Sequence, residues 1–271
     1  MVKRILLYFV IIMLLVSVVS RYVISPWVKN RVIGLYERVN MENSAPTKAP
    51  PGIPQIKDYA VSSNLPPIHA DLNGDGTEET IVAYYGTTQG RTEGCNQTEP
   101  VLLKIYSGNS EAFSLKTSSK DTYNFNEISH LSVETDLGGK TYVFFGEDVS
   151  GCGSGYQGLN YFISHHPETK DFKADINLPS SELSNIFIKD FSASYAGREI
   201  LITRAVWDET ESHFEAHRQG VEVYYWNGKY WNQKDFGNSK NKHFDLNGGT
   251  PETVDQFLSD EPLIATKLKS L

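Results

Sequence analysis

A nine-residue acidic loop that leads straight into an apolar strand constrains the fold of this chain more than any other feature. The loop reads Asp-Leu-Asn-Gly-Asp-Gly-Thr-Glu-Glu from position 71 to position 79. Oxygen-bearing side chains stand at alternate positions, Asp71, Asn73 and Asp75, and the glycine that follows permits a sharp reversal of the backbone. Calcium (Ca2+) takes about six to eight oxygen ligands at short range. The pattern therefore predicts a calcium site, completed by the Thr77 carbonyl and by Glu79.

The residues that follow the loop, 80–85, are β-branched and aromatic and predict a strand. An EF-hand is excluded, because its twelfth position requires a bidentate Glu and Val82 stands there. A short calcium loop that enters a strand resembles the FG-GAP repeat, also called the VCBS or integrin alpha-like repeat, over residues 68–86. Glu79 stands where that family usually has Asp. The alternative is an Asp- and Gly-rich turn that binds no metal. The resemblance implies the metal ligands Asp71, Asn73, Asp75, Thr77 and Glu79.

The strand–turn–strand pattern around this loop recurs twice in weaker form. The turn glycines Gly76, Gly139 and Gly197 are 63 and then 58 residues apart, and a further strand-like run follows each unit. Only the first unit keeps the metal residues; the third keeps almost none of them. We therefore expect an all-β fold of FG-GAP-like repeats, which form a small or incomplete β-propeller or a β-meander. The three units comprise residues 68–84 with 101–106, 131–145 with 159–164, and 188–203 with 221–226.

Two local signals mark the last third of the chain. Asn227-Gly228, between aromatic runs, predicts a hairpin with a type I′ turn. Its aromatic residues suit either a recognition platform or cross-strand packing, and packing is favoured. Residues 245–253 look like a degenerate copy of the first loop, and Thr253 or Asp255 is placed to cap a helix over 254–258.

The N-terminus predicts a membrane segment. Lys3 and Arg4 precede an uncharged apolar run that extends from Ile5 to Val19. We expect an uncleaved signal anchor with the body in the periplasm or outside the cell, and a cleaved signal peptide is the alternative. The expected organisation is a transmembrane helix and juxtamembrane segment over 1–39, a Pro-rich linker over 40–57, an extracytoplasmic β domain over 58–260, and a C-terminal tail over 261–271.

The two cysteines stand in separate Gly-rich loops. Cys95 lies in the loop 86–96 and Cys152 in the loop 148–158. An exported compartment permits disulfides, and an even count favours one bridge between the two loops. A thiol nucleophile is the alternative. Loops joined on one face of a β scaffold would make a candidate partner site.

Charge and motifs limit the function. The chain has a net charge of −8, and the part beyond residue 38 has 19 basic and 32 acidic residues, a net of −13. Such a body repels phosphate, so we expect no nucleic-acid partner. His213 and His217 have a spacing that suits zinc on a helix, but their charged surroundings favour a solvated hairpin loop.

We therefore expect a membrane-anchored binding or scaffolding module rather than an enzyme. Calcium would be mainly structural, and the partner would be a protein or an envelope component. A cell-envelope hydrolase, using the acidic residues with His213 and His217, is one alternative. An extracytoplasmic inhibitor or immunity-type protein, docking through the two cysteine loops, is the other.

Overall fold

Three antiparallel sheets of four or five strands, a separate two-stranded hairpin and two C-terminal helices make up the part of the chain that the computed structural model describes. The predicted predominance of β structure is therefore confirmed. The segment 1–39, predicted to hold a membrane helix, lies outside this part, and within it no helix is long and apolar enough to cross a membrane. The described residues are 52–271 without 63–64, 87–88, 93–94, 99–100, 118–124, 151–155, 182–183, 193, 196, 209–210, 212–214 and 244–252.

Sheet 1 is formed around β3, whose one edge pairs with β1 and β2 in succession and whose other edge pairs with β6. The outermost strand, β7, pairs with β6. A separate hairpin of β4 and β5 is inserted between β3 and β6. The strands are β1 (Tyr59–Val61), β2 (Ile68–Ala70), β3 (Glu79–Gly86), β4 (Gln89–Thr92), β5 (Cys95–Thr98), β6 (Leu102–Ser107) and β7 (Ser110–Lys116).

Sheets 2 and 3 are four-stranded meanders, in which each strand pairs with the next along the chain. The second and third units predicted from the sequence thus each form one sheet with the addition of a fourth strand. Sheet 2 contains β8 (Phe125–Leu137), β9 (Lys140–Ser150), β10 (Tyr156–His166) and β11 (Asp171–Ser181). Sheet 3 contains β12 (Ser184–Lys189), β13 (Glu199–Val206), β14 (Arg218–Trp226) and β15 (Trp231–Asn238).

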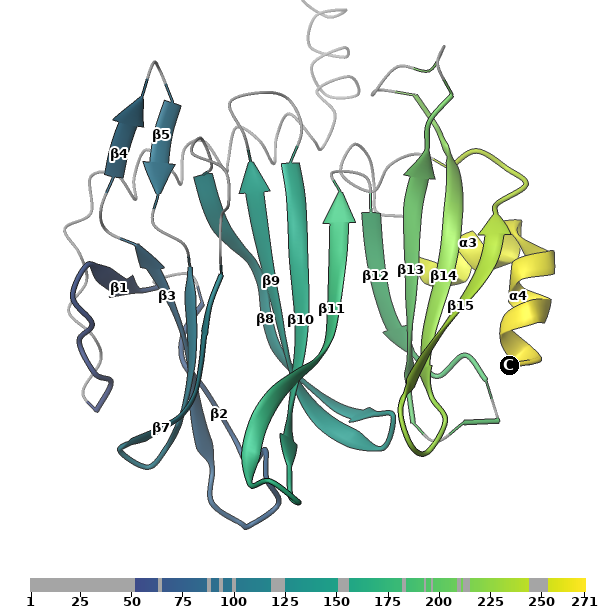
Figure 1. Cartoon of the computed structure of the whole chain (residues 1–271). Helices are drawn as coiled ribbons and strands as arrows, with labels where there is room; N and C mark the ends of the chain where they lie inside the picture. Colours follow the sequence, from purple (N-terminus) through teal and green to yellow (C-terminus); the bar gives the residue numbers. More distant parts are fainter. Residues whose placement is uncertain are drawn as a thin grey trace, which may run out of the picture.

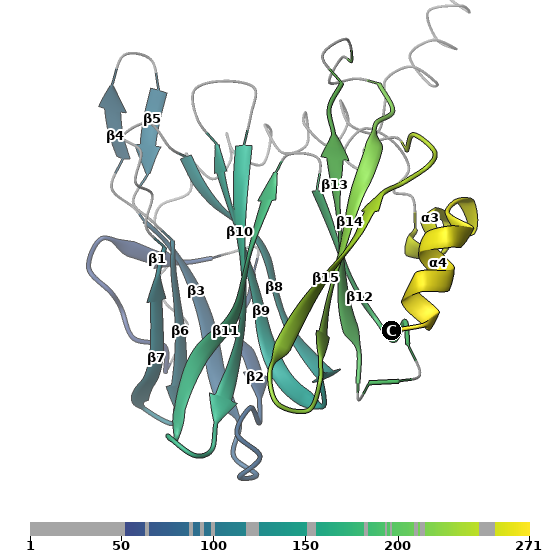
Figure 2. The ribbon, with the colours of Figure 1, turned by 45° about the vertical axis from the view of Figure 1, so that its right-hand side comes forward.

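The sheets stand side by side in chain order, and the helices α3 (Val254–Asp260) and α4 (Pro262–Lys269) lie beyond sheet 3 (Figures 1 and 2). One hydrophobic cluster fills the space between sheets 1 and 2 and another the space between sheets 2 and 3. The loops that follow β2, β8 and β12 all lie at the lower end of the molecule in these views.

The continuous apolar runs arise because sheet 2 lies between the other two sheets and the outer faces of sheets 1 and 3 are also covered. Successive side chains of a strand point to opposite faces. In β9, Val143 and Phe145 face sheet 1, whereas Tyr142 and Phe144 face sheet 3. All four are buried. A strand with two buried faces shows no alternation of polar and apolar residues, which explains the apolar second strand of each unit.

Both ends of the row of sheets are covered. On the outer face of sheet 1, Ile53 and Ile56 pack against a cluster that includes Tyr84 and Tyr106, although both isoleucines belong to the predicted Pro-rich linker. On the outer face of sheet 3, the helices pack through Phe257, Ile264 and Leu268, two of which belong to the predicted C-terminal tail.

The start of α3 follows the sequence prediction. Thr253 is the N-cap, its side chain accepts the N–H of Gln256, and the Gln256 side chain accepts the N–H of Thr253. This reciprocal pair is a capping box, which satisfies two donors that a helix N-terminus otherwise leaves unpaired.

The hairpin between β14 and β15 forms as predicted, but its turn differs. Four residues, 227–230, connect the strands, and Gly228 has a φ of +91°. Asn227 is not among the described residues with positive φ, so the type I′ prediction is wrong. The Asn227 carboxamide instead accepts the backbone N–H groups of Lys229 and Tyr230.

Candidate functional site

The predicted calcium loop connects β2 to β3, and its side-chain oxygens accept hydrogen bonds from its own backbone. Asp71 accepts the N–H of Gly74 at 2.7 Å and the N–H of Gly76 at 2.9 Å. Asn73 Oδ1 accepts the N–H of Asp75 at 2.8 Å, and Asp75 Oδ1 accepts that of Thr77 at 2.7 Å. These bonds fold the loop into a compact reversal. Since each oxygen has a second lone pair, it keeps the capacity to bind a cation.

Glu79 is the buried anchor of the loop. Its side chain is fully buried at the first position of β3, opposite Ala70. Oε2 accepts the N–H of Leu72 at 2.9 Å, and Oε1 accepts Nδ2 of Asn73 at 2.9 Å. A buried carboxylate is tolerated only with such partners. Because the partners come from the loop itself, Glu79 holds the loop against the end of the strand.

The Asn73 amide lies between two carboxylates. Its Nδ2 group donates to Glu79 and also to Asp75 Oδ2, at 3.1 Å. The N–H of Thr77, followed by this amide, lowers the pKa of the Asp75 carboxyl below its ordinary value. Asp75 is therefore charged at neutral pH, as a calcium ligand must be.

The loop fits calcium by its chemistry more than by its present arrangement. All five predicted ligands supply oxygen, which is the donor that calcium prefers. However, within the described residues no group of three or more His, Cys, Asp or Glu side chains is arranged to hold a metal ion. Coordination would require Asn73 to turn its oxygen inward in place of Nδ2. The metal-free turn considered from the sequence thus remains an alternative.

Leu72 connects the loop to the space between the sheets. It is buried in the cluster between sheets 1 and 2, which also contains Phe172 of β11. Leu137 occupies the corresponding place between sheets 2 and 3, and Phe191 packs against the cluster between sheet 3 and the helices. Each of these residues follows an Asp. An apolar residue at the end of β8, or two residues after the end of β2 or β12, therefore packs against the next layer.

The third unit repeats the buried anchor, which the sequence analysis missed. Glu199 is buried at the first position of β13, opposite Lys189. Its carboxylate accepts the N–H of Phe191 at 2.7 Å and the Ser192 hydroxyl at 2.6 Å. Glu79 makes the corresponding contacts in the first unit, with the N–H of Leu72 and the side chain of Asn73. The signal in the sequence is a Glu directly before an apolar run in both units.

The turns of the second and third units dock on each other. Arg198 donates its N–H to the carbonyl of Asp136 at 2.7 Å, and its own carbonyl accepts the N–H of Gly138 at 3.2 Å. A Cβ on Gly197 would lie 2.4 Å from the Asp136 oxygen and 2.6 Å from the Gly139 nitrogen. Only glycine permits this close approach of two backbones.

The histidine prediction is wrong in one respect. His213 lies outside the described residues, but His217 is fully buried and does not belong to a solvated loop. Its backbone forms a two-bond bridge with His243, and its Nδ1 lies 2.8 Å from Glu211. Lys242 pairs with the same carboxylate. Hydrogen bonds from Lys242 and His217 lower the pKa of Glu211 to about 2.

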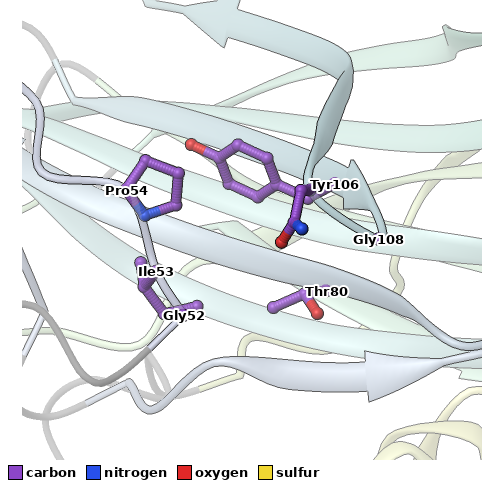
Figure 3. Close-up of a pocket in the computed structure, with 7 residues that line it drawn as sticks. Gly52, Ile53, Pro54, Thr80, Tyr106 and Gly108 are labelled. Carbon is purple, nitrogen blue, oxygen red and sulfur yellow. The ribbon is translucent and has the colours of Figure 1, made fainter.

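A small cavity lies on the outer face of sheet 1, and its size and lining residues differ from those of a catalytic cleft. Its volume is about 230 Å³, below the roughly 300–1,000 Å³ of typical ligand sites. Figure 3 shows Tyr106 beside Pro54. The Tyr106 hydroxyl lies 3.1 Å from the hydroxyl of Tyr84. No carboxylate or imidazole is among the lining residues, which are Gly52, Ile53, Pro54, Thr80, Tyr106, Gly108 and Asn109.

The predicted disulfide lies partly outside the described residues. Cys95 is the first residue of β5, whereas Cys152 belongs to the segment 151–155.

Comparisons of the chain with protein-family models, with curated proteins and with solved structures find no match.

Proposed function

We propose that this chain is a membrane-anchored extracytoplasmic β-repeat module that acts in binding or scaffolding and is stabilised by calcium. The observation that carries the proposal is the loop between β2 and β3. It combines oxygen side chains at alternate positions with an apolar residue, Leu72, that packs between two sheets. An ion bound in this loop would strengthen the contact between sheets 1 and 2, in which Leu72 takes part.

The repeat architecture supports the likeness to FG-GAP repeats. Three antiparallel sheets, of which sheets 2 and 3 are meanders of consecutive strands, face one another in chain order with a hydrophobic cluster between neighbouring sheets. We interpret them as three blades of an incomplete β-propeller. The covered outer faces of sheets 1 and 3 explain how such a row ends without closing into a ring.

The role of calcium follows from the charges of the loop. Asp71, Asp75, Glu78 and Glu79 stand within nine residues that contain no basic side chain. When bound, the ion supplies positive charge that offsets their mutual repulsion. Asp71, Asn73, Asp75 and Glu79 would hold it through side-chain oxygens, and Thr77 through its carbonyl. The loop already positions Leu72 through the N–H that Glu79 accepts, so a tighter loop holds the two sheets together more firmly.

The enzyme and inhibitor alternatives have less support. An envelope hydrolase would need accessible acid and base groups, whereas His217 is buried and the cavity of Figure 3 has no titratable carboxylate or imidazole in its lining. An inhibitor or immunity-type protein would dock through the loops of Cys95 and Cys152. No contact in the described residues favours that role over scaffolding.

The test is a thermal melt of the full chain in detergent, with calcium and with chelator. At a calcium concentration of about 100 times Kd, binding stabilises the folded state by about 2.7 kcal/mol. We expect a rise in the midpoint of roughly 5–10 °C for a domain of this size. Asp75→Ala should abolish the rise. Asp190→Ala, at the equivalent place in the third unit, should retain it.

Isothermal titration with calcium separates binding from stabilisation. Heat of binding without a change in the midpoint would argue against a structural role. An unchanged midpoint together with no heat of binding would reject the calcium site itself.

A further inference from the structure

The turn between β14 and β15 contains a chemical feature that the proposed function does not use. Asparagine followed by glycine can cyclise, because the glycine nitrogen has no neighbouring Cβ to hinder its attack on the asparagine Cγ. The chain has three such pairs, at Asn73, Asn227 and Asn247, and the last lies outside the described residues. We propose that Asn227-Gly228 is a self-catalysed deamidation site, whereas folding protects Asn73-Gly74.

The reaction forms a bond between the Gly228 nitrogen and Asn227 Cγ. The nitrogen loses its proton to solvent, and negative charge develops on Oδ1 in the tetrahedral intermediate. The bond between Cγ and Nδ2 then breaks, and ammonia leaves with a proton from water. Water opens the resulting succinimide at either carbonyl. The products are aspartate or isoaspartate at position 227, and no oxidant or reductant is needed.

The turn stabilises the charge that this reaction develops. Asn227 Oδ1 accepts two backbone N–H groups, from Lys229 at 2.9 Å and from Tyr230 at 3.0 Å. Two N–H donors on one oxygen are the arrangement of an oxyanion hole, which stabilises a tetrahedral intermediate. Both donors are in place before the reaction begins.

The nucleophile and the leaving group at this turn are free to react. Within the described residues, neither the Gly228 N–H nor the Asn227 Nδ2 group has a hydrogen-bond partner in the protein. Both residues are exposed. A Cβ added to Gly228 would meet no atom within 4 Å, so the turn has room for the change of backbone angle that ring closure requires.

Asn73-Gly74 has the same sequence and the opposite constraints. The Gly74 N–H donates to Asp71 at 2.7 Å, which occupies the nucleophile. The Asn73 Nδ2 group donates to both Asp75 and Glu79, so the leaving group is held by two carboxylates. Among the described residues, Oδ1 of Asn73 accepts only the N–H of Asp75. Cyclisation there requires several of these bonds to break first.

Conversion of Asn227 to isoaspartate disturbs the contact between sheets 2 and 3. The hairpin positions Trp231, whose Nε1 donates to the Tyr142 hydroxyl of sheet 2 at 2.9 Å. Trp226 packs closely against Gly138, at the turn of sheet 2. Isoaspartate lengthens the backbone of the turn by one methylene group and so disturbs the register that places both tryptophans.

The test compares the two pairs within one molecule. The full chain in detergent is held at neutral pH, folded or in denaturant, and the conversion at each site is followed by peptide mapping with mass spectrometry. Enzymatic methylation identifies isoaspartate. We expect Asn227 to convert in the folded protein at least as fast as in denaturant. Asn73 should convert on the order of tenfold more slowly when folded, because its hydrogen bonds must break.

A pair of variants tests the oxyanion donors. Lys229→Pro removes one of the two N–H groups, whereas Lys229→Ala retains it. We expect the proline variant to convert Asn227 on the order of tenfold more slowly than the alanine variant. Equal rates in the two folded variants would overturn the catalytic part of the proposal. If the proline variant fails to fold, the unaltered chain provides the test. The proposed site is refuted if folding slows the conversion of Asn227 as much as it slows the conversion of Asn73.

Discussion

Gly197→Ala tests whether the turns of the second and third units hold sheets 2 and 3 together. Gly197 has a φ of +77°, and an added Cβ would lie 2.4 Å from the Asp136 oxygen. Gly139 is a matched control, because its φ is +75° and an added Cβ would meet nothing within 4 Å. Both substitutions therefore carry the same backbone strain, and only one carries the clash.

The magnitudes of the two effects differ enough to be separated. A residue with a Cβ in the left-handed region costs roughly 1–2 kcal/mol, which is the whole expected loss for Gly139→Ala. At Gly197 the clash is with backbone atoms, and relief requires the two turns to separate. Overpacking adds about 1–3 kcal/mol, and weakening of the bond from Arg198 to Asp136 adds about 1 kcal/mol. The expected loss for Gly197→Ala is thus about 3–6 kcal/mol.

Urea denaturation measures both free energies of unfolding. The midpoint and slope of each curve give the free energy in water, provided that the slope is unchanged between variants. We expect Gly197→Ala to lose at least about 2 kcal/mol more than Gly139→Ala, on the sum of the two added costs. Equal losses, within about 0.5 kcal/mol, would refute the idea that the turns are tightly docked.

Two further predictions concern buried and titrating groups. Glu199→Ala leaves two hydrogen-bond donors without their acceptor and should cost roughly 2–4 kcal/mol in urea denaturation, more than Glu199→Gln; an Ala variant as stable as the Gln variant would contradict the anchoring role. Burial acts to lower the pKa of His166, but hydrogen bonds to Asp175 and Glu168 outweigh it and raise the pKa. The stabilisation by His166 is therefore complete below its unfolded pKa of about 6.5 and is lost as the pH rises through the raised folded value. Burial lowers the pKa of His130, so the stability difference between the unaltered chain and the variant should change with pH in opposite directions for His166→Gln and His130→Gln. Parallel changes would exclude these assignments.

The sheets could be predicted from the sequence because their strands carry local signals. The second strand of each unit is an apolar, β-branched and aromatic run bounded by glycine turns. Such a run can be predicted as a strand from its own residues, without knowledge of the strands with which it pairs. The cap of α3 is equally local, because Thr253 and Gln256 satisfy each other within one helical turn.

Features that depend on register or on distant partners could not be predicted. A comparison anchored on the turn glycines misaligns the glutamates, because Glu79 follows Gly76 by three residues and Glu199 follows Gly197 by two. Their shared role appears only when strand pairing fixes the first position of each second strand. The burial of His217 likewise depends on its bridge to His243, which is 26 residues away in the chain.

The meander order of the strands has a consequence for how the chain acquires its structure. Sheets 2 and 3 are each made from consecutive strands, so their pairings close short loops and carry a small entropic cost. During synthesis, which proceeds from the N-terminus, sheet 1 can form before the later strands have been made. Each new sheet can then pack against the apolar face of the preceding sheet. The last face, on sheet 3, is covered by the final helices, α3 and α4. A chain that stops before residue 254 would expose Leu201, Val221 and Val223, which gives a quality-control system a surface by which to recognise unfinished copies.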